Sequence, residues 1–173
     1  RYVGRTFIQP GSTRGDSARC KYTPLPEILK GKRVFLIEDS IVRSTTLKTL
    51  VHQLRSRGKA REIHVRVACP PIVSPCFYGI DMSTLDELFA PGFVRKNYDG
   101  TLTPNEQREM AAALGIDSLR YLPVPELGAC LAMENSHLCT GCVMGKYPTE
   151  KGNQLMTRAR KNYGKVQTGR TYE

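Results

Sequence analysis

The stretch Val34–Thr46 gathers the side chains best suited to hold a phosphorylated sugar. Its sequence, VFLIEDSIVRSTT, begins with four apolar residues, continues with the carboxylates Glu38 and Asp39, and ends in a loop rich in hydroxyl groups. Two adjacent carboxylates suit the vicinal hydroxyls of a ribose, or a Mg²⁺ ion that bridges sugar and pyrophosphate oxygens. The backbone N–H groups of the loop, together with the hydroxyls of Ser44–Thr46, can cradle a phosphate.

Such a loop needs a strand before it and a helix after it, and the flanking sequence predicts both. Val34–Ile37 is a short apolar run, and apolar residues then recur at helical spacing from Leu47 to Leu54, with Gly58 as the helix end. The alternating stretch Glu62–Ala68 predicts the next strand. A strand, a helix and a strand within about 35 residues form a βαβ unit of a parallel sheet, in which ligands bind at the carboxyl ends of the strands.

Further short elements are expected around this unit. Thr103–Leu114 is predicted to be a helix with Thr103 as N-cap, Pro104 in its first turn and Glu106 three residues after the cap. Cys69–Asp81 holds three prolines and predicts an irregular connection, and the basic tail from Lys151 predicts a surface-lying or partly disordered end. The other expected elements are a strand at Tyr2–Ile8, a long loop at Gln9–Lys21, a short helix at Thr84–Ala90, an extended piece at Ser118–Pro123 and a small helix at Pro125–Met133.

The charge balance favours an anionic partner. The chain has 26 Lys and Arg against 16 Asp and Glu, a formal net charge of +10. Nucleic acid, a membrane surface and a phosphorylated substrate are the candidate partners, and a solvated basic surface is the simplest alternative. Because the charge is spread along the chain and a phosphate-type loop is present, the sequence favours a small anionic substrate.

Neither a transmembrane segment nor a signal peptide is visible in the sequence. No apolar run approaches ~20 residues, and the N-terminal stretch has no apolar core of the secretory type. We therefore expect a cytoplasmic protein with no membrane partner. The first residues, from Arg1 onward, look like the inside of an element, so we also expect the chain to be a piece of a longer protein.

The cysteines predict metal ligation rather than disulfide bonds. Without a secretory signal, an even number of cysteines is better explained by a metal or a cluster. Cys139 and Cys142 form a CxxC motif, and Cys76 adds a third soft ligand upstream. An iron–sulfur cluster or a four-sulfur zinc site needs four such ligands, and buried thiols without a metal are the plain alternative. The six cysteines are Cys20, Cys69, Cys76, Cys130, Cys139 and Cys142.

The motif VFLIEDSIVRSTT resembles the phosphoribosyl pyrophosphate (PRPP) motif of the type I phosphoribosyltransferases. The resemblance is closest to the glutamine-dependent amidophosphoribosyltransferase family, because YVGRTFIQP, KYTP, CPPIVSPCFYGID and CTGCVMGKYPTE also look like that family, in the same order. It covers about Arg1 to Glu150. It implies an α/β class with a partial type I phosphoribosyltransferase fold: a parallel sheet with flanking helices, plus a helical C-terminal segment.

This resemblance also implies a division of the chain. Residues 1–125 would form the phosphoribosyltransferase domain, incomplete at its N-terminal side. Residues 126–150 would form a cysteine-containing segment, and residues 151–173 a basic tail.

The resemblance implies roles for individual residues. Glu38 and Asp39 would bind the ribose hydroxyls and Mg²⁺, and Lys21, in the loop that closes over PRPP, would reach the substrate as a catalytic residue. Two positions depart from the family pattern: Glu38 stands where Asp is usual, and Ser44 stands where Gly is usual. The 5′-phosphate loop would comprise Ser40, Ile41, Val42, Arg43, Ser44, Thr45 and Thr46, with Arg14 and Arg19 in an altered closing loop.

The three motif cysteines carry a further implication. Cys76, Cys139 and Cys142 match cysteines that hold a 4Fe–4S cluster in part of the family, with the fourth ligand upstream of Arg1. Zinc is the chemical alternative. The cluster would tie the C-terminal segment to the sheet. Cys20, Cys69 and Cys130 have no matching role, and the three histidines are expected to be structural or on the surface.

The implied activity is a pentosyl transfer: ammonia from glutamine would displace pyrophosphate from PRPP and form 5-phosphoribosylamine, the first step of de novo purine (IMP) biosynthesis. A glutaminase domain in the missing N-terminal part of the polypeptide is the implied partner, and a homo-oligomer is expected. Without that part the chain should be an incomplete enzyme. The alternatives are a PRPP-binding regulator of the same fold that binds DNA and a base-salvage phosphoribosyltransferase; the cysteines argue against both.

Overall fold

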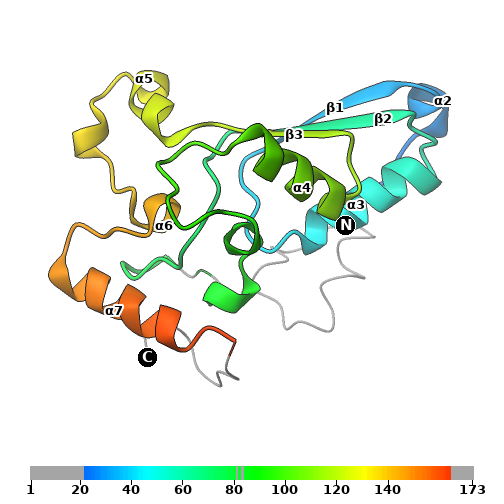
Figure 1. Cartoon of the computed structure of the whole chain (residues 1–173). Helices are drawn as coiled ribbons and strands as arrows, with labels where there is room; N and C mark the ends of the chain where they lie inside the picture. Colours follow the sequence, from blue (N-terminus) through cyan, green and yellow to red (C-terminus); the bar gives the residue numbers. More distant parts are fainter. Residues whose placement is uncertain (1–21, 81, 83, 165–173) are drawn as a thin grey trace.

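The computed structural model describes residues 22–80, 82 and 84–164, and its centre is a parallel sheet (Figure 1). The strands β1 (Arg33–Glu38), β2 (Glu62–Val67) and β3 (Ser118–Tyr121) lie in the order β1-β2-β3. Val34 pairs with Ile63, and Val65 pairs with Leu119, with both strand pairs parallel. The expected α/β class with a parallel sheet is therefore confirmed.

Helices and 3-10 turns connect and flank the strands (Figure 1). The helices are α2 (Pro26–Leu29), α3 (Thr45–Ser56), α4 (Pro104–Leu114), α5 (Leu127–Leu131), α6 (Gly141–Met144) and α7 (Glu150–Lys161). The 3-10 turns are η2 (Leu85–Glu87), η3 (Ala90–Gly92), η4 (Val124–Glu126) and η5 (Asn135–His137).

The main hydrophobic core lies between the sheet and the helices α3 and α4, which lie on the same side of the sheet (Figure 1). Alternate residues of β2 face this core, and Ile63 and Val65 are both fully buried. Helix α3 contributes the buried face Leu47, Leu50, Val51 and Leu54, as its spacing predicts. This packing fixes the start of α3 beside the end of β1, and so it positions the loop between them.

The N-terminus of α4 confirms the predicted capping arrangement. The Thr103 hydroxyl accepts a hydrogen bond from the Glu106 amide at 3.2 Å, and the Glu106 carboxylate accepts one from the Thr103 amide at 2.7 Å. A third amide, that of Arg95, donates to the same carboxylate at 3.0 Å. Burial raises the pKa of Glu106, but these hydrogen bonds outweigh it and hold the pKa below its usual value.

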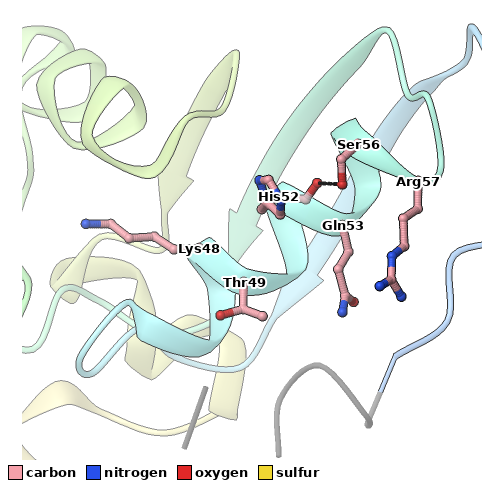
Figure 2. A pocket seen from close by; sticks show the side chains of 6 residues that line it. All are labelled: Lys48, Thr49, His52, Gln53, Ser56 and Arg57. Carbon is pink, nitrogen blue, oxygen red and sulfur yellow. Dashed lines mark hydrogen bonds between the residues drawn. The ribbon is translucent and has the colours of Figure 1, made fainter. Parts of the chain in front are cut away.

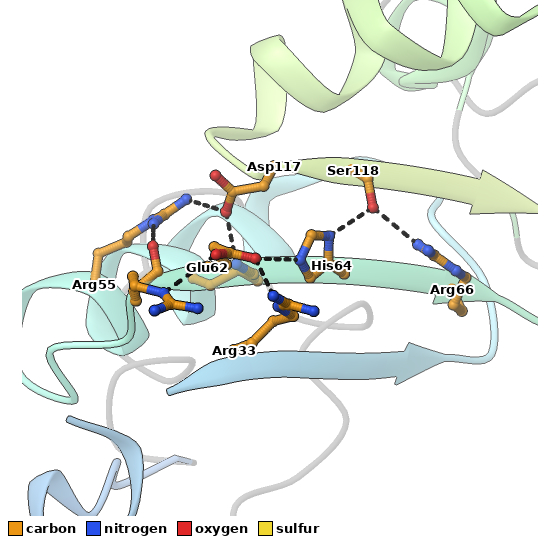
Figure 3. A network of polar contacts seen from close by, with 9 residues as sticks. Arg33, Arg55, Glu62, His64, Arg66, Asp117 and Ser118 are labelled. Atoms are coloured by element: carbon orange, nitrogen blue, oxygen red, sulfur yellow. Dashed lines mark hydrogen bonds and ion pairs between the residues drawn. The ribbon is translucent and has the colours of Figure 1, made fainter. Parts of the chain in front are cut away.

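The other face of the sheet carries exposed apolar side chains and a polar network (Figure 3). Phe35 and Ile37 of β1 are 60% and 69% exposed. Glu62 bridges Arg33 at 2.8 Å and His64 at 3.1 Å. His64 also bonds the Ser118 hydroxyl through Nδ1 at 2.8 Å, so charged and polar groups link all three strands.

Two local predictions need correction. The basic tail from Lys151 is expected to lie on the surface or to be partly disordered, but α7 covers Glu150–Lys161 and packs Gly152, Met156 and Ala159 against the rest of the chain. Thr84–Ala90 was predicted as one short helix, but the chain forms two separate 3-10 turns there, with Pro91 inside the second. A proline lacks the N–H that a continuing helix needs.

The end of α3 agrees with the prediction, because Gly58 follows it. The left-handed residue there is Lys59, with φ +56°. Gly58 is required for space instead: a Cβ there would lie 2.8 Å from the Leu54 carbonyl oxygen and 3.0 Å from Leu29.

Several predictions lie outside the described residues. These are the strand Tyr2–Ile8 and the closing loop Gln9–Lys21, which includes Arg14, Arg19, Cys20 and Lys21. Within the described part of the chain, none of the helices combines the length and the apolar character needed to span a bilayer.

Candidate functional site

The predicted acidic pair lies at the carboxyl end of β1. Glu38 is the last residue of the strand, and its carbonyl oxygen accepts a hydrogen bond from the Ala68 amide at 2.9 Å. The Asp39 carboxylate is exposed and accepts from the Ser40 amide at 2.6 Å and from the Ser40 hydroxyl at 3.3 Å. The Asp39 carboxylate therefore stabilises the start of the loop. Both carboxylates lie at the edge of the sheet where parallel folds bind ligands.

The loop that follows turns its apolar residue inward and its hydroxyl residues outward. Ile41 is only 4% exposed and belongs to the main core, whereas Thr45 and Thr46 are exposed. Ser44, the N-cap of α3, has φ +63° and makes no side-chain cap hydrogen bond. The first amides of α3 are therefore not capped by Ser44, and they lie beside three hydroxyl groups. This combination suits an anion such as a phosphate.

Arg43 lies within the loop but is engaged by another part of the protein. Its guanidinium lies 3.1 Å from the Glu87 carboxylate. One residue earlier, the Val42 carbonyl accepts a hydrogen bond from the Phe89 amide at 2.8 Å. Two contacts thus fasten the loop to the segment around η2.

Three buried or partly buried side chains near the acidic pair, those of Cys69, Tyr98 and Tyr121, were not predicted as part of the site. Cys69 follows β2 and lies near Asp39; burial first, and then the Asp39 charge, raises the pKa of this thiol. Tyr121, at the end of β3, and Tyr98 also lie near Cys69, and burial raises the pKa of both phenols. Among the described residues, neither phenol oxygen has a hydrogen-bond partner. Their positions in the sequence could have indicated this, because Cys69 comes just after β2 and Tyr121 ends the neighbouring parallel strand β3.

The three motif cysteines lie in one neighbourhood. Cys142 is partly buried, and burial, followed by the nearby Cys76, Cys69 and Cys139 thiols, raises its pKa to about 11. Cys139 is exposed. The donor chemistry suits a soft metal, but in the described part of the chain no three His, Cys, Asp or Glu side chains are placed to hold a metal ion. The thiols of Cys76, Cys139 and Cys142 therefore lie near one another, but among the described residues they are not arranged as the ligands of a metal ion.

Tyr147 attaches the cysteine-containing segment to the chain that follows β2. Its hydroxyl donates to the Ser74 hydroxyl at 2.8 Å and contacts the Pro75 carbonyl. Ser74 in turn donates to the Gly141 carbonyl at 3.0 Å. The Tyr147 ring packs on Phe77, with ring centroids 4.9 Å apart. The segment Ser74–Phe77 therefore packs against Tyr147, which lies between α6 and α7.

The hollow seen in Figure 2 is separate from these residues. It has a volume of about 440 Å³, lies along the outer side of α3 and contains none of the predicted site residues. It is lined by Lys48, Thr49, His52, Gln53, Ser56 and Arg57.

Known proteins similar to this chain share both sequence and fold with it. The amidophosphoribosyltransferase of Methanocaldococcus jannaschii is 44% identical over 151 residues, which cover 87% of this chain. The chloroplastic amidophosphoribosyltransferase of Glycine max is 39% identical over 158 residues, covering 91% of this chain. The solved structure of the glutamine PRPP amidotransferase from B. subtilis, complexed with ADP and GMP, matches with a TM-score of 0.63 and 40% identity over 87% of this chain. No protein-family model matches the chain.

The similarity covers all but a small part of this chain but only a minor part of each relative. The chain spans 29% of the M. jannaschii protein, 26% of the G. max protein and 31% of the B. subtilis chain. The sheet, its flanking helices and the loop after β1 therefore lie within a region that the relatives share.

Proposed function

Because this chain is related to a segment of the amidophosphoribosyltransferases, we propose that it forms the PRPP-binding part of such an enzyme. The observation that carries the proposal is the loop after β1: an acidic pair at the strand end is followed by hydroxyl side chains at the start of α3. This is the place where a parallel sheet binds a ligand, and its groups match the two ends of a sugar phosphate.

The proposed reaction transfers ammonia, released from glutamine, to the anomeric carbon of PRPP, and pyrophosphate leaves. Glu38 and Asp39 bind the ribose hydroxyls and orient the sugar. The amides and hydroxyls of Ser40–Thr46 hold the 5′-phosphate. Positive charge develops on the sugar as pyrophosphate departs, so catalysis rests on orientation and on electrostatic stabilisation rather than on a nucleophilic side chain.

Glu38 and Asp39 are also the proposed ligands of Mg²⁺. Protein sites for Mg²⁺ often supply only one or two carboxylates and leave the remaining positions to water and substrate phosphates, so a pair of acids suffices. When bound, the ion neutralises charge on the pyrophosphate leaving group. The exposed position of Asp39 leaves room for such a ligand.

The cysteine segment has a proposed role of its own. Cys76, Cys139 and Cys142 would supply three of the four ligands of a 4Fe–4S cluster, or of zinc, and the fourth would come from outside the described residues. The proposal also assigns residues 1–125 to the transferase domain and makes Lys21 a residue that contacts the substrate. A glutaminase domain lies elsewhere in the polypeptide. The protein assembles into a homo-oligomer and is located in the cytoplasm.

The test is equilibrium binding of PRPP to the purified protein, with and without MgCl2. We expect binding that Mg²⁺ strengthens and that Glu38→Gln or Asp39→Asn weakens about tenfold or more, since each loses hydrogen bonds to a charged group. Glu109→Gln, which removes an exposed carboxylate from α4, is the matched control and should leave binding unchanged. Wild-type protein that binds no PRPP would refute the proposal.

A further inference from the structure

The phosphate loop and the segment around η2 are joined by a pair of contacts that the proposed chemistry does not use. Arg43 lies 3.1 Å from the Glu87 carboxylate, with side-chain exposures of 24% and 45%. The second contact is the 2.8 Å hydrogen bond from the Phe89 amide to the Val42 carbonyl. Loop and segment are thus linked twice, across a separation of 44 positions for the Arg43–Glu87 pair.

Glu87 also contacts the start of its own turn. Its carboxylate accepts from the Thr84 amide at 3.3 Å, and the Thr84 side chain accepts in return from the Glu87 backbone, which forms a capping box for η2. Leu85 and Leu88, on either side, are buried in the second hydrophobic cluster. The carboxylate that meets Arg43 is therefore presented by an anchored turn and not by a free side chain.

The loop, by contrast, contains a residue in an unfavourable backbone conformation. Ser44 directly follows Arg43 and has φ +63°, a conformation that costs a residue with a side chain about 1–2 kcal/mol. A strained residue persists only where its neighbours hold it in place. On the N-terminal side, those neighbours are Val42 and Arg43, and both are fastened to the η2 segment.

We propose that Glu87 is a positioning residue for PRPP, which acts through Arg43 by holding the phosphate loop in its binding shape. This inference rests on the proposed function and deepens it. Arg43 is then a brace of the loop and not a direct phosphate ligand, and the 5′-phosphate is held by backbone amides and hydroxyls. The alternative is that Arg43 leaves Glu87 and grips the phosphate with its own charge.

The two roles predict opposite effects of removing the Glu87 charge. If Arg43 grips phosphate, Glu87 competes with the substrate, and Glu87→Gln should tighten PRPP binding. If the pair is a brace, Glu87→Gln should loosen the loop and weaken PRPP binding about tenfold, while kcat of the whole enzyme at saturating PRPP falls much less than KM rises.

The experiment measures the Kd for PRPP in MgCl2 for wild type, Glu87→Gln, Arg43→Gln and the double variant, together with the unfolding midpoint of each. We expect similar weakening in both single variants and no further weakening in the double variant, because both break one interaction. Glu109→Gln on α4 is the control for loss of an exposed carboxylate. If Glu87→Gln does not fold, Glu87→Ala, which also removes the charge, takes its place with the same expected directions.

Tighter or unchanged binding in Glu87→Gln, or additive weakening in the double variant, would overturn the positioning role. Wild-type protein that binds no PRPP would instead overturn the proposed function. In that case denaturant unfolding alone tests whether Glu87 braces the loop through Arg43. A measurable coupling between Arg43→Gln and Glu87→Gln in the free energy of unfolding supports this role, and the absence of coupling overturns it.

Discussion

The hydroxyl oxygen of Tyr147 lies 2.8 Å from the hydroxyl oxygen of Ser74, although 73 positions separate the two residues. Both side chains are buried, and the phenol also contacts the Pro75 carbonyl. This contact joins the irregular segment after β2 to the segment between α6 and α7, so a side-chain hydrogen bond attaches the cysteine-containing segment to the rest of the fold.

The first prediction concerns that attachment. Tyr147→Phe keeps the ring packed on Phe77 but removes the buried hydroxyl that donates to Ser74 and contacts the Pro75 carbonyl. We expect a loss of about 1–2 kcal/mol in the free energy of unfolding, measured by urea denaturation. Tyr163→Phe, at a tyrosine that is 52% exposed, should change little. Equal stability of Tyr147→Phe and wild type would contradict this account.

The buried phenol of Tyr121 predicts the opposite result. Its side chain is 9% exposed, and its oxygen has no hydrogen-bond partner among the described residues. Tyr121→Phe removes a buried polar group that gains nothing in return, so the free energy of unfolding should stay the same or rise by up to about 1 kcal/mol. A clear loss in urea denaturation would reveal a partner for this hydroxyl.

Replacing Ser44 by glycine should stabilise the protein. At φ +63°, glycine avoids the steric cost that serine bears, although it loses more conformational entropy on folding. We expect Ser44→Gly to raise the free energy of unfolding by about 0.5–1 kcal/mol. Thr45→Gly, one residue into α3, is the matched control and should lower it. If both changes destabilise the protein, backbone strain at Ser44 is refuted.

Asp117 predicts a loss of stability in acid. Its Oδ2 atom lies 2.6 Å from both the Ile63 amide nitrogen and an Arg55 nitrogen (Figure 3). Burial raises the pKa of Asp117, but these two donors outweigh it and hold the pKa below 3.8. The stabilisation is therefore present above pH 3.8 and is lost as the pH falls through the lower, folded-state value.

Asp117→Asn tests this sign. At pH 6 we expect it to cost about 1–2 kcal/mol in the free energy of unfolding, because a charge-assisted hydrogen bond is replaced by a neutral one. The difference from wild type should shrink as the pH falls below 3.8, because the unfolded carboxylate is protonated first and the native carboxylate only at its lower, folded-state pKa. A difference that stays constant from pH 6 to pH 3 would show that the carboxylate charge is not involved.

Cys142 should react slowly in metal-free protein. Burial and the neighbouring thiols raise its pKa from 9.0 to about 11, so at pH 8 its thiolate fraction is about 100-fold lower than that of an unshifted thiol. Iodoacetamide labelling followed by mass spectrometry should modify the exposed Cys130 first, and labelling of Cys142 should accelerate as the pH approaches 11. Equally fast labelling of the two cysteines at pH 8 would contradict the shift.

The sheet and its two covering helices could be predicted because their signals are local. The apolar run of β1, the alternation of β2 and the spacing of Leu47–Leu54 each follow from one stretch of sequence. The capping box of Thr103 and Glu106 lies within four residues, and it was predicted and found. The position of the loop at a strand end followed from these elements.

What the sequence did not reveal depends on distant contacts or on small residues. Helix α7 buries Gly152 and Ala159 beside Met156, so its packed face shows almost no hydrophobic period. A side chain at Gly152 would collide with Tyr78 and Tyr147, which lie elsewhere in the chain. The partner of Arg43 could not be predicted either, because Glu87 is 44 positions away and reaches it only once η2 has folded.

The open side of β1 has a consequence for solution behaviour. Among the described residues β1 pairs only with β2, and it also exposes Phe35 and Ile37 to solvent. A free strand edge with apolar side chains is a template for intermolecular β-pairing, which flanking charges such as Arg33 and Glu38 oppose. Within the described residues, the strand that presents the acidic pair at one end therefore also offers an edge suited to intermolecular pairing.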